Sequence, residues 1–382
     1  RSVAVSIATQ SGSVAGGSPV ELANSMRMQI RGSFNTVPPE EPTPPSPPVD
    51  IGNPGLMAGP GGLVLEGGHV NGGDAYVMGR VTSPSTNLSG QIGGDRVAVS
   101  GMFPRSGPPT NLFVAGIGCG TTDFPVYCAG QQPVQVTGSY VGIYGGVCAT
   151  GQTSTSKINA FGGQPGLKLG CNAPTVNLPT FDKASFVSKM TNGTATGSSV
   201  SCHGSSQKTQ LQANTTYTGD ASAGFYCTMQ INGSVYIKGN LKSDGYAKIV
   251  VAESAGTVRP IVVVNGKIDL RGRSVEPNSL GTTPYFISFH SANSSCSNSD
   301  SCITLSNADL KATLDSTADS CGFSCTAFSA PAIYLHGAKA PGSTFYAYFG
   351  EVAGAFYSTA GAFGGQRVYI SWPLSVNMDA GL

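Results

Sequence analysis

The sequence predicts an all-β fold in which short strands stack as the rungs of a β-solenoid, or β-helix. Three observations predict it. Only 11% of the 382 residues are charged, whereas a helical bundle or coiled coil needs many Glu, Lys and Arg residues. Glycine is abundant, with 53 residues, as expected where a chain turns corners between short strands. Short apolar runs that end at these glycines also echo one another along the chain.

The charge balance limits the classes of function. Lys and Arg together number 21 and Asp and Glu 20, so the formal net charge is +1. A near-neutral chain lacks the electric field of a bulk nucleic-acid-binding protein. A disordered chain is excluded as well, because 40% of the residues are hydrophobic. This composition is typical of an all-β extracellular protein.

The start of the chain differs from the rest. We expect residues 1–37 to be a stalk or a pilin-like remnant, with a short strand pattern and a short helix. The helix is predicted to begin at Ser18-Pro19-Val20-Glu21, because Ser is a preferred N-cap and Pro fits the first helical position. Residues 38–54 are rich in proline, which favours extended polyproline geometry. We interpret them as a semi-rigid linker.

Two β domains are predicted after the linker, a Gly-rich domain at 55–177 and a β-solenoid domain with a Cys-rich loop at 178–382. Near their boundary, Lys183 to Met190 is expected to form a short helix capped by Asp182, because Asp is a favoured N-cap residue. A helix here would separate two regions of short strands.

Internal echoes predict the stacking in both domains. The run from Gly72 to Gly79 returns in the run that starts at Gly93. The run from Val235 to Leu241 returns as Val262 to Ile268, and more loosely as Ile333 to Gly337. One rung cannot bury its inward face alone, so repeated runs are expected to stack on one another.

Ten cysteines, all after residue 118, indicate an oxidising compartment. Connectivity does not follow from sequence, and we hypothesise that sequential neighbours pair and clamp local loops. The expected disulfides are Cys119–Cys128, Cys148–Cys171, Cys202–Cys227, Cys296–Cys302 and Cys321–Cys325. A zinc site made by the last four cysteines is the alternative, although the tight C-x2-C spacing common in such sites is missing. An exported chain without a long apolar run implies that its export signal or anchor lies outside this sequence.

Several runs resemble one known family. They are Leu178-Pro179-Thr180-Phe181, Gly233 to Leu241, Pro260 to Gly272, Ala330 to Gly337, Phe345 to Val352 and Gly361 to Val368. Together they resemble the glycine-rich β-solenoid domain of large type IV pilin-like surface proteins, including competence-associated minor pilins. The resemblance covers residues from about 176 to 372 and implies display outside the cell, with other pilus or surface subunits as partners. The hydrophobic pilin helix of that family is not found in this sequence.

Catalytic motifs are not found. The four histidines form no H-E-x-x-H pattern, and no G-x-S-x-G elbow occurs. Asp74 and Asp95 could lie one rung apart and bind Ca²⁺, but a Gly-Gly-Asp sequence is also an ordinary turn in which Asp bonds the nearby backbone. We favour the turn and expect no catalytic residue, no metal and no cofactor.

Two features are candidate binding surfaces. The first is basic and would form a stripe able to hold phosphates or acidic glycans if its members lie on adjacent rungs. It comprises Lys238, Lys242, Lys248, Arg259, Lys267, Arg271 and Arg273. The second is the aromatic C-terminal region with Tyr346, Tyr348 and Trp372, whose rings could stack on bases or sugars. The alternatives are solvent-facing charges that prevent sheet-edge aggregation, and rings that cap the core.

The sequence therefore predicts an extracellular, non-enzymatic, type IV pilus-associated surface protein that presents a β-solenoid for adhesion or for capture of DNA or an acidic glycan. A secreted β-helix enzyme acting on carbohydrates is one alternative, and it requires several carboxylates that converge in a groove. A structural filament subunit is the other.

Overall fold

The computed structural model of the chain describes fifteen segments, all within one compact unit, Pro44–Leu382. These segments are residues 54–79, 81–83, 90–93, 110–114, 134–136, 141–149, 158–161, 168–169, 178–190, 194–195, 199–272, 275–290, 331–355, 357–371 and 375–377. The expected stalk, almost all of the Pro-rich linker and the Cys-rich loop lie outside them.

The predicted all-β class is confirmed, since the described residues are mostly β-strands in parallel sheets with very little helix. Helix α1 spans Lys183–Ser188, and a 3-10 turn spans Glu253–Ala255. Every pairing between the described strands is parallel, and the strands fall into three columns in which each strand bonds the strand of the next turn. We refer to these as the first, second and third columns.

The first column holds the following strands or parts of strands: β12 (Thr194–Ala195), β15 (Thr215–Tyr217), β18 (Val235–Ile237), β21 (Ile261–Val264), β24 (Tyr285–Ser288), β26 (Lys339–Ala355), β27 (Thr359–Ser371), β1 (Pro54–Glu66), β3 (Asp74–Val77), β6 (Leu112–Val114), β9 (Val147–Ala149) and β11 (Lys168–Leu169). Long strands β1, β26 and β27 bend and contribute to more than one column.

The second column holds β13 (Val200–His203), β16 (Ala221–Gly224), β19 (Leu241–Ser243), β22 (Ile268–Arg271), β25 (Ile333–His336), later parts of β26, β27 and β1, then β4 (Val81–Ser83) and β7 (Val134–Val136). The third column holds β14 (Lys208–Leu211), β17 (Thr228–Ile231), β20 (Lys248–Val251) and β23 (Val275–Glu276), and separately the starts of β26 and β27 with β28 (Ser375–Asn377), β2 (His69–Asn71), β5 (Gly90–Ile92), β8 (Val141–Tyr144) and β10 (Ile158–Phe161).

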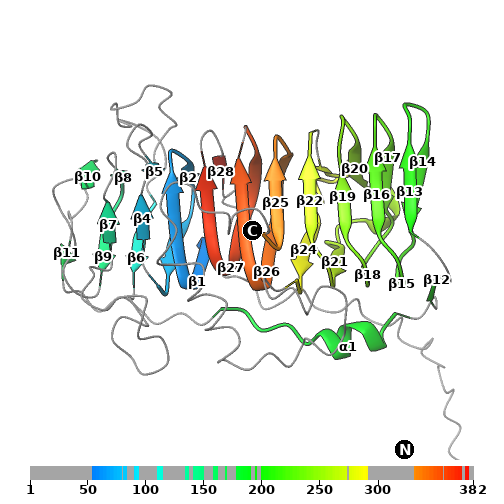
Figure 1. Cartoon of the computed structure of the whole chain (residues 1–382), viewed down its shortest axis with the longest axis horizontal. Helices are drawn as coiled ribbons and strands as arrows, with labels where there is room; N and C mark the ends of the chain where they lie inside the picture. The colour runs from blue at the N-terminus through cyan, green and yellow to red at the C-terminus, as the bar shows by residue number, and fades with distance from the viewer. Residues whose placement is uncertain are drawn as a thin grey trace, which may run out of the picture. The chain divides into compact units, whose positions relative to one another are not determined.

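The order of strands along the stack is not the order along the chain. We call Pro54 to Leu169 the N-terminal arm and Thr194 to Asn377 the C-terminal arm. The last strands of the C-terminal arm pair with the first strands of the N-terminal arm, with Phe363 opposite Leu56 and Val376 opposite Val70. Figure 1 shows the blue strands β1 and β2 beside the red strands β27 and β28. Residues on both sides of the expected boundary at 177/178 therefore share one sheet.

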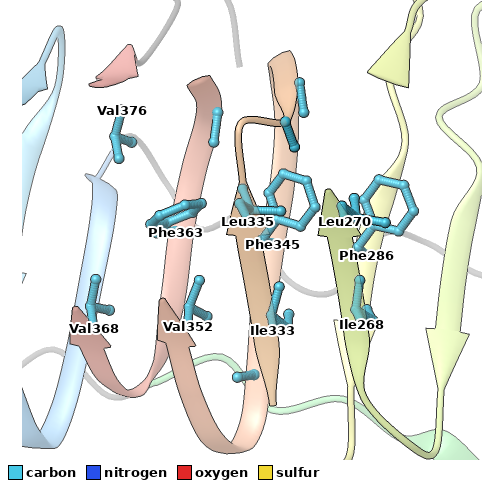
Figure 2. Packing of buried hydrophobic residues seen from close by; sticks show 14 of the residues in the cluster. Ile268, Leu270, Phe286, Ile333, Leu335, Phe345, Val352, Phe363, Val368 and Val376 are labelled. Atoms are coloured by element: carbon cyan, nitrogen blue, oxygen red, sulfur yellow. The ribbon is translucent and has the colours of Figure 1, made fainter. Parts of the chain in front are cut away.

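The main core lies inside the stack and is built from ladders of like side chains. Ile268, Ile333, Val352 and Val368 lie in one row across successive strands, and Phe286, Phe345 and Phe363 lie in another (Figure 2). The rings of Phe286 and Phe345 stack with centroids 5.0 Å apart. Parallel in-register pairing puts equivalent positions of neighbouring rungs side by side, so inward apolar residues pack against their own kind.

A second apolar cluster covers the outer face of the first column. The segment 178–190, including α1, contributes Phe186 to this cluster, which also holds Tyr236, Ile261 and Tyr285. The strands β18, β21 and β24 are consequently buried on both faces, which explains the uninterrupted apolar run of β21. The predicted cap is confirmed, because the Asp182 carboxylate accepts a hydrogen bond from the Ser185 amide at 2.9 Å.

The echo of Val235 to Leu241 in Val262 to Ile268 is confirmed as strand register. Val235 lies opposite Val262 in the first column, and Leu241 lies opposite Ile268 in the second. The looser third copy, Ile333 to Gly337, does not lie in the column expected from its likeness to Val235 to Gly239. Ile333 pairs with Ile268 in the second column rather than with Val262 in the first, because apolar-Gly runs occur at more than one corner of each rung. The second copy of the Gly72 echo, beyond Gly93, lies outside the described residues.

Candidate functional site

The basic residues of the first candidate surface fall on different parts of the stack. Lys242 and Arg271 face outward from the second column, where Asp269 lies opposite Lys242 in register. The Arg271 guanidinium donates to both Asp269 oxygens at 2.9–3.1 Å, and this carboxylate raises the pKa of Arg271. The charge of Arg271 is thereby compensated by Asp269.

The other described basic residues lie elsewhere. Lys248 faces outward from the third column and forms an ion pair with Glu276 at 2.8 Å. The half-buried Arg259 guanidinium donates hydrogen bonds to the Thr283 and Gly342 carbonyls. Its central carbon lies 3.9 Å from the centroid of the Tyr285 ring. Lys238 and Lys267 are half-buried at turns between the first and second columns. These residues therefore do not form one stripe, and Arg273 lies outside the described residues.

The aromatic residues of the second candidate surface are not exposed where the structure describes them. Tyr346 is 2% exposed, and its hydroxyl donates to the Pro179 carbonyl at 2.8 Å. Tyr348 is half-buried and stacks on Phe289 with centroids 4.9 Å apart. Segment 178–190 covers this face, so the rings belong to the second apolar cluster and Tyr346 is not available as a binding platform. Trp372 lies outside the described residues.

One of the five expected disulfides is present. Cys202 of β13 is bonded to Cys227, which precedes β17, and both side chains are buried. At least one cysteine of each other expected pair lies outside the described residues, as do the four cysteines of the zinc alternative. Among the residues that are described, no group of three potential metal ligands occurs.

Asp74 is the first residue of β3, and the hydrogen bonds of its carboxylate reach a neighbouring rung rather than the nearby backbone of a turn. Its carboxylate accepts from the backbone and side-chain amides of Asn111, at 3.3 and 3.0 Å. Asp220 does the same for Asn240 at another corner, at 2.8 and 3.1 Å. Asp95 lies outside the described residues. The carboxylate of Asp74, one member of the possible calcium pair, is thus used in hydrogen bonds between rungs.

The most prominent exposed feature is a set of aromatic side chains at the turns between the second and third columns. Phe225 is 57% exposed, Tyr226 52% and Tyr246 54%. The rings of Tyr226 and Tyr246 stack at 5.1 Å with an interplanar angle of 11°, and His203 lies 5.0 Å from Phe225. We call His203, Phe225, Tyr226, Asp244 and Tyr246 the aromatic corner.

The backbone of the aromatic corner is unusual. Phe225, Tyr226 and Tyr246 have φ values of 39°, 63° and 69°, in the left-handed region. Bulky residues are uncommon there, because Cβ approaches the following carbonyl oxygen, and glycine or asparagine fits at lower cost. The signal in the sequence was an aromatic residue following glycine in successive turns, as in Gly224-Phe225 and Gly245-Tyr246.

Two buried titratable groups lie away from this corner. Glu351 is buried near Arg367, with 3.3 Å between the charged atoms, and burial raises the pKa of Glu351 to about 7 despite the arginine. Burial, with the nearby Lys267 charge, lowers the pKa of His290 to about 4. Both groups are built into the body of the stack rather than presented to a ligand.

In comparisons with protein families, curated proteins and solved structures, nothing matches the chain. Within the described segments, no helix has the length and apolar character needed to cross a membrane.

Proposed function

We propose that the protein is an extracellular, non-enzymatic surface protein of the pilus-associated type that its sequence resembles, and that it adheres to its target through the aromatic corner. The observation that carries this proposal is the exposure of Phe225, Tyr226 and Tyr246, each more than half accessible and held on neighbouring turns of one parallel stack. Large aromatic rings with one polar end are the side chains that most often anchor binding surfaces.

The proposed architecture is a β-solenoid, in which the three columns are the faces of successive rungs. In-register parallel pairing in each column supports it. Such a stack is stiff, because every rung is hydrogen-bonded to the next along its strands, and a stiff scaffold presents its corner residues in fixed positions. The buried Cys202–Cys227 disulfide supports export, since structural disulfides persist outside the cytosol.

Adhesion is favoured over DNA capture by the way the charges are used. Arg271 is held by Asp269 and Lys248 by Glu276, so neither offers its full charge to phosphates. The carboxylates Asp74 and Asp220 are likewise engaged at corners. Aromatic contacts at the corner are the better-supported source of affinity.

The test displays the complete chain on the surface of a bacterial host and measures retention on abiotic and biological surfaces. Accessibility to an impermeant amine label on intact cells checks export. The triple variant Phe225→Asn, Tyr226→Asn, Tyr246→Asn is expected to lose most retention, because Asn tolerates left-handed φ while the rings are removed.

The matched control for the triple variant is Tyr357→Asn. Tyr357 is also exposed, at 65%, and also has positive φ, at 56°, but it lies at the turn between β26 and β27. Retention should survive in this control. A displayed, labelled protein with no retention, or retention equal in the triple variant and the wild type, would overturn the proposal.

A further inference from the structure

Two polar side chains converge at Gly224, beside the exposed rings of the aromatic corner. His203, Gly224 and Asp244 occupy outward positions on three neighbouring turns of the second column, with His203 opposite Gly224 in register. A Cβ placed on Gly224 would lie 2.9 Å from His203 Nδ1 and 3.0 Å from Asp244 Oδ1. The imidazole and the carboxylate thus both approach one point above Gly224, so closely that a methyl group there would displace one of them.

Hydrogen bonds hold the backbone at both of these residues. The amide of Asp244 donates to the Ala223 carbonyl at 3.0 Å, and the amide of His203 donates to Gln207 Oε1 at 3.0 Å. Gly224 itself accepts from the Cys227 amide at 3.2 Å, next to the disulfide. The backbone positions that carry the imidazole and the carboxylate are therefore held in place, which lowers the entropy lost on binding.

Apolar surface lies directly next to these two polar side chains. Phe225 follows Gly224 in the chain, lies 5.0 Å from the His203 ring and is 57% exposed. The Tyr226–Tyr246 stack extends the aromatic surface to the next turn. A sugar ring has an apolar C–H face and a rim of hydroxyls, so it needs an aromatic surface with hydrogen-bonding groups beside it. Imidazole can donate or accept a hydrogen bond, and a carboxylate accepts one from a hydroxyl.

The Asp244 carboxylate beside Gly224 disfavours acidic ligands. Asp244 repels phosphate, sulfate and uronate groups, and the neighbouring Arg271 is forked onto Asp269. The positive φ of Phe225 adds a second argument, because an aromatic side chain in this conformation costs backbone energy that asparagine would avoid. The ring is therefore expected to contribute something other than stability.

From this geometry we propose that the surface formed by His203, Gly224, Phe225 and Asp244 is a binding site for one ring of a neutral polysaccharide. This proposal specifies the ligand class for the proposed adhesion, and it rests on that function. His203 and Asp244 hydrogen-bond ring hydroxyls, and Phe225 packs on the sugar's apolar face. The Tyr226–Tyr246 stack supports the adjacent part of the glycan.

The experiment measures binding of the purified, disulfide-intact chain to amorphous cellulose, chitin and agarose, with alginate and double-stranded DNA as acidic probes. Binding to at least one neutral polysaccharide is expected, with little change between low and high salt. Gly224→Ala, Asp244→Ala and Phe225→Asn should each weaken that binding by about tenfold or more, whereas Lys242→Ala and Tyr357→Asn should leave it unchanged.

Thermal unfolding separates a binding role from a structural one. Phe225→Asn should unfold at the wild-type temperature or above it while losing affinity, because Asn relieves the left-handed strain. Equal affinity in the wild type, Gly224→Ala and Phe225→Asn would overturn the site, as would a clear preference for alginate or DNA that salt abolishes. If surface retention persists but none of the neutral polysaccharides binds, the sugar site is wrong and the adhesion proposal stands.

Discussion

The hydroxyl of Tyr369 donates a hydrogen bond to the carboxylate of Glu66, a residue 303 positions away in the sequence. These residues lie on β27 and β1, whose parallel pairing joins the end of the C-terminal arm to the start of the N-terminal arm. The chain thus enters the stack in its middle, follows the N-terminal arm to one end of the stack, and re-enters at β12 of the C-terminal arm. The order of the strands along the stack is therefore a circular permutation of their order along the chain.

The first prediction tests this topology. A circular permutant with Asn377 joined to Pro54 by a few glycines, and with new termini between residues 169 and 178, should fold with the wild-type β content. The turn from β2 to β3 makes the equivalent step from third to first column through only Gly72 and Gly73. Far-ultraviolet circular dichroism and thermal unfolding check the result.

A permutant opened between Gly239 and Asn240 is the control. Both residues accept hydrogen bonds from the next rung, from the amides of Gly266 and Lys267 at 3.0 and 2.9 Å. Opening the chain here should therefore destabilise the protein. Equal stability of the two permutants would contradict the proposed order of rungs.

The second prediction concerns the covering segment 178–190. Phe186 is 1% exposed in the second apolar cluster. Phe186→Ala should lower the free energy of unfolding by about 3–5 kcal/mol, as a buried aromatic ring is replaced by a cavity. Lys189→Ala, at an exposed position of the same turn, should change it by less than about 0.5 kcal/mol. Denaturant titration measures both, and a negligible effect of Phe186→Ala would show that the segment does not contribute to stability.

The third prediction concerns the Cys202–Cys227 bridge. Replacing both cysteines with alanine should cost about 2–4 kcal/mol, mainly by freeing the unfolded chain. The double variant lacks this bridge, so reducing agent should not remove this contribution to its free energy of unfolding. The measurement is the free energy of unfolding with and without reductant. Equal values for the wild type and the double variant under oxidising conditions would contradict the prediction.

The fourth prediction concerns pH. The pKa of Glu351 is raised to about 7 by burial, so this group stabilises the folded state at low pH and that stability is lost as pH rises from about 4.5 to 7. The pKa of His290 is lowered to about 4, so its contribution is complete above about pH 6.5 and is lost as pH falls towards 4. Each effect is on the order of 3 kcal/mol, and the two oppose each other in the shared range.

Single substitutions should separate the two opposing effects. Glu351→Gln should become more stable as pH rises from 4 to 6.5, and His290→Asn should become less stable as pH rises from 4.5 to 7. The wild type should vary less than either variant. Denaturant midpoints across this range provide the measurement, and parallel pH profiles for all three proteins would refute the assignment.

Much of the fold could be predicted from the sequence because its signals are local. Glycine after a short apolar run marks a corner, and the echo of one such run in the next gave the register of Val235 with Val262. Asp182 before Lys183 predicted the start of α1. The choice of Cys227 as the partner of Cys202 followed from nearness in the sequence.

The candidate site was predicted less well. Arg271 and Lys248 are close in sequence, but they lie in different columns with separate acidic partners. Tyr346 was a candidate for stacking on a ligand, with a ring that caps the core as the alternative, and segment 178–190 covers it from a distant part of the chain. Exposure of a side chain depends on what covers it, and local pattern does not reveal a cover contributed by another segment.

The sequence by itself determined the β class, the corners and the spacing of neighbouring rungs in the C-terminal arm, since these depend on side-chain alternation and turn chemistry within a few residues. Only the tertiary structure decided that Tyr226 stacks on Tyr246 and that β27 pairs with β1. Parallel strands are joined by backbone hydrogen bonds that any residues except proline can make, so a pairing between distant segments leaves no sequence motif of its own.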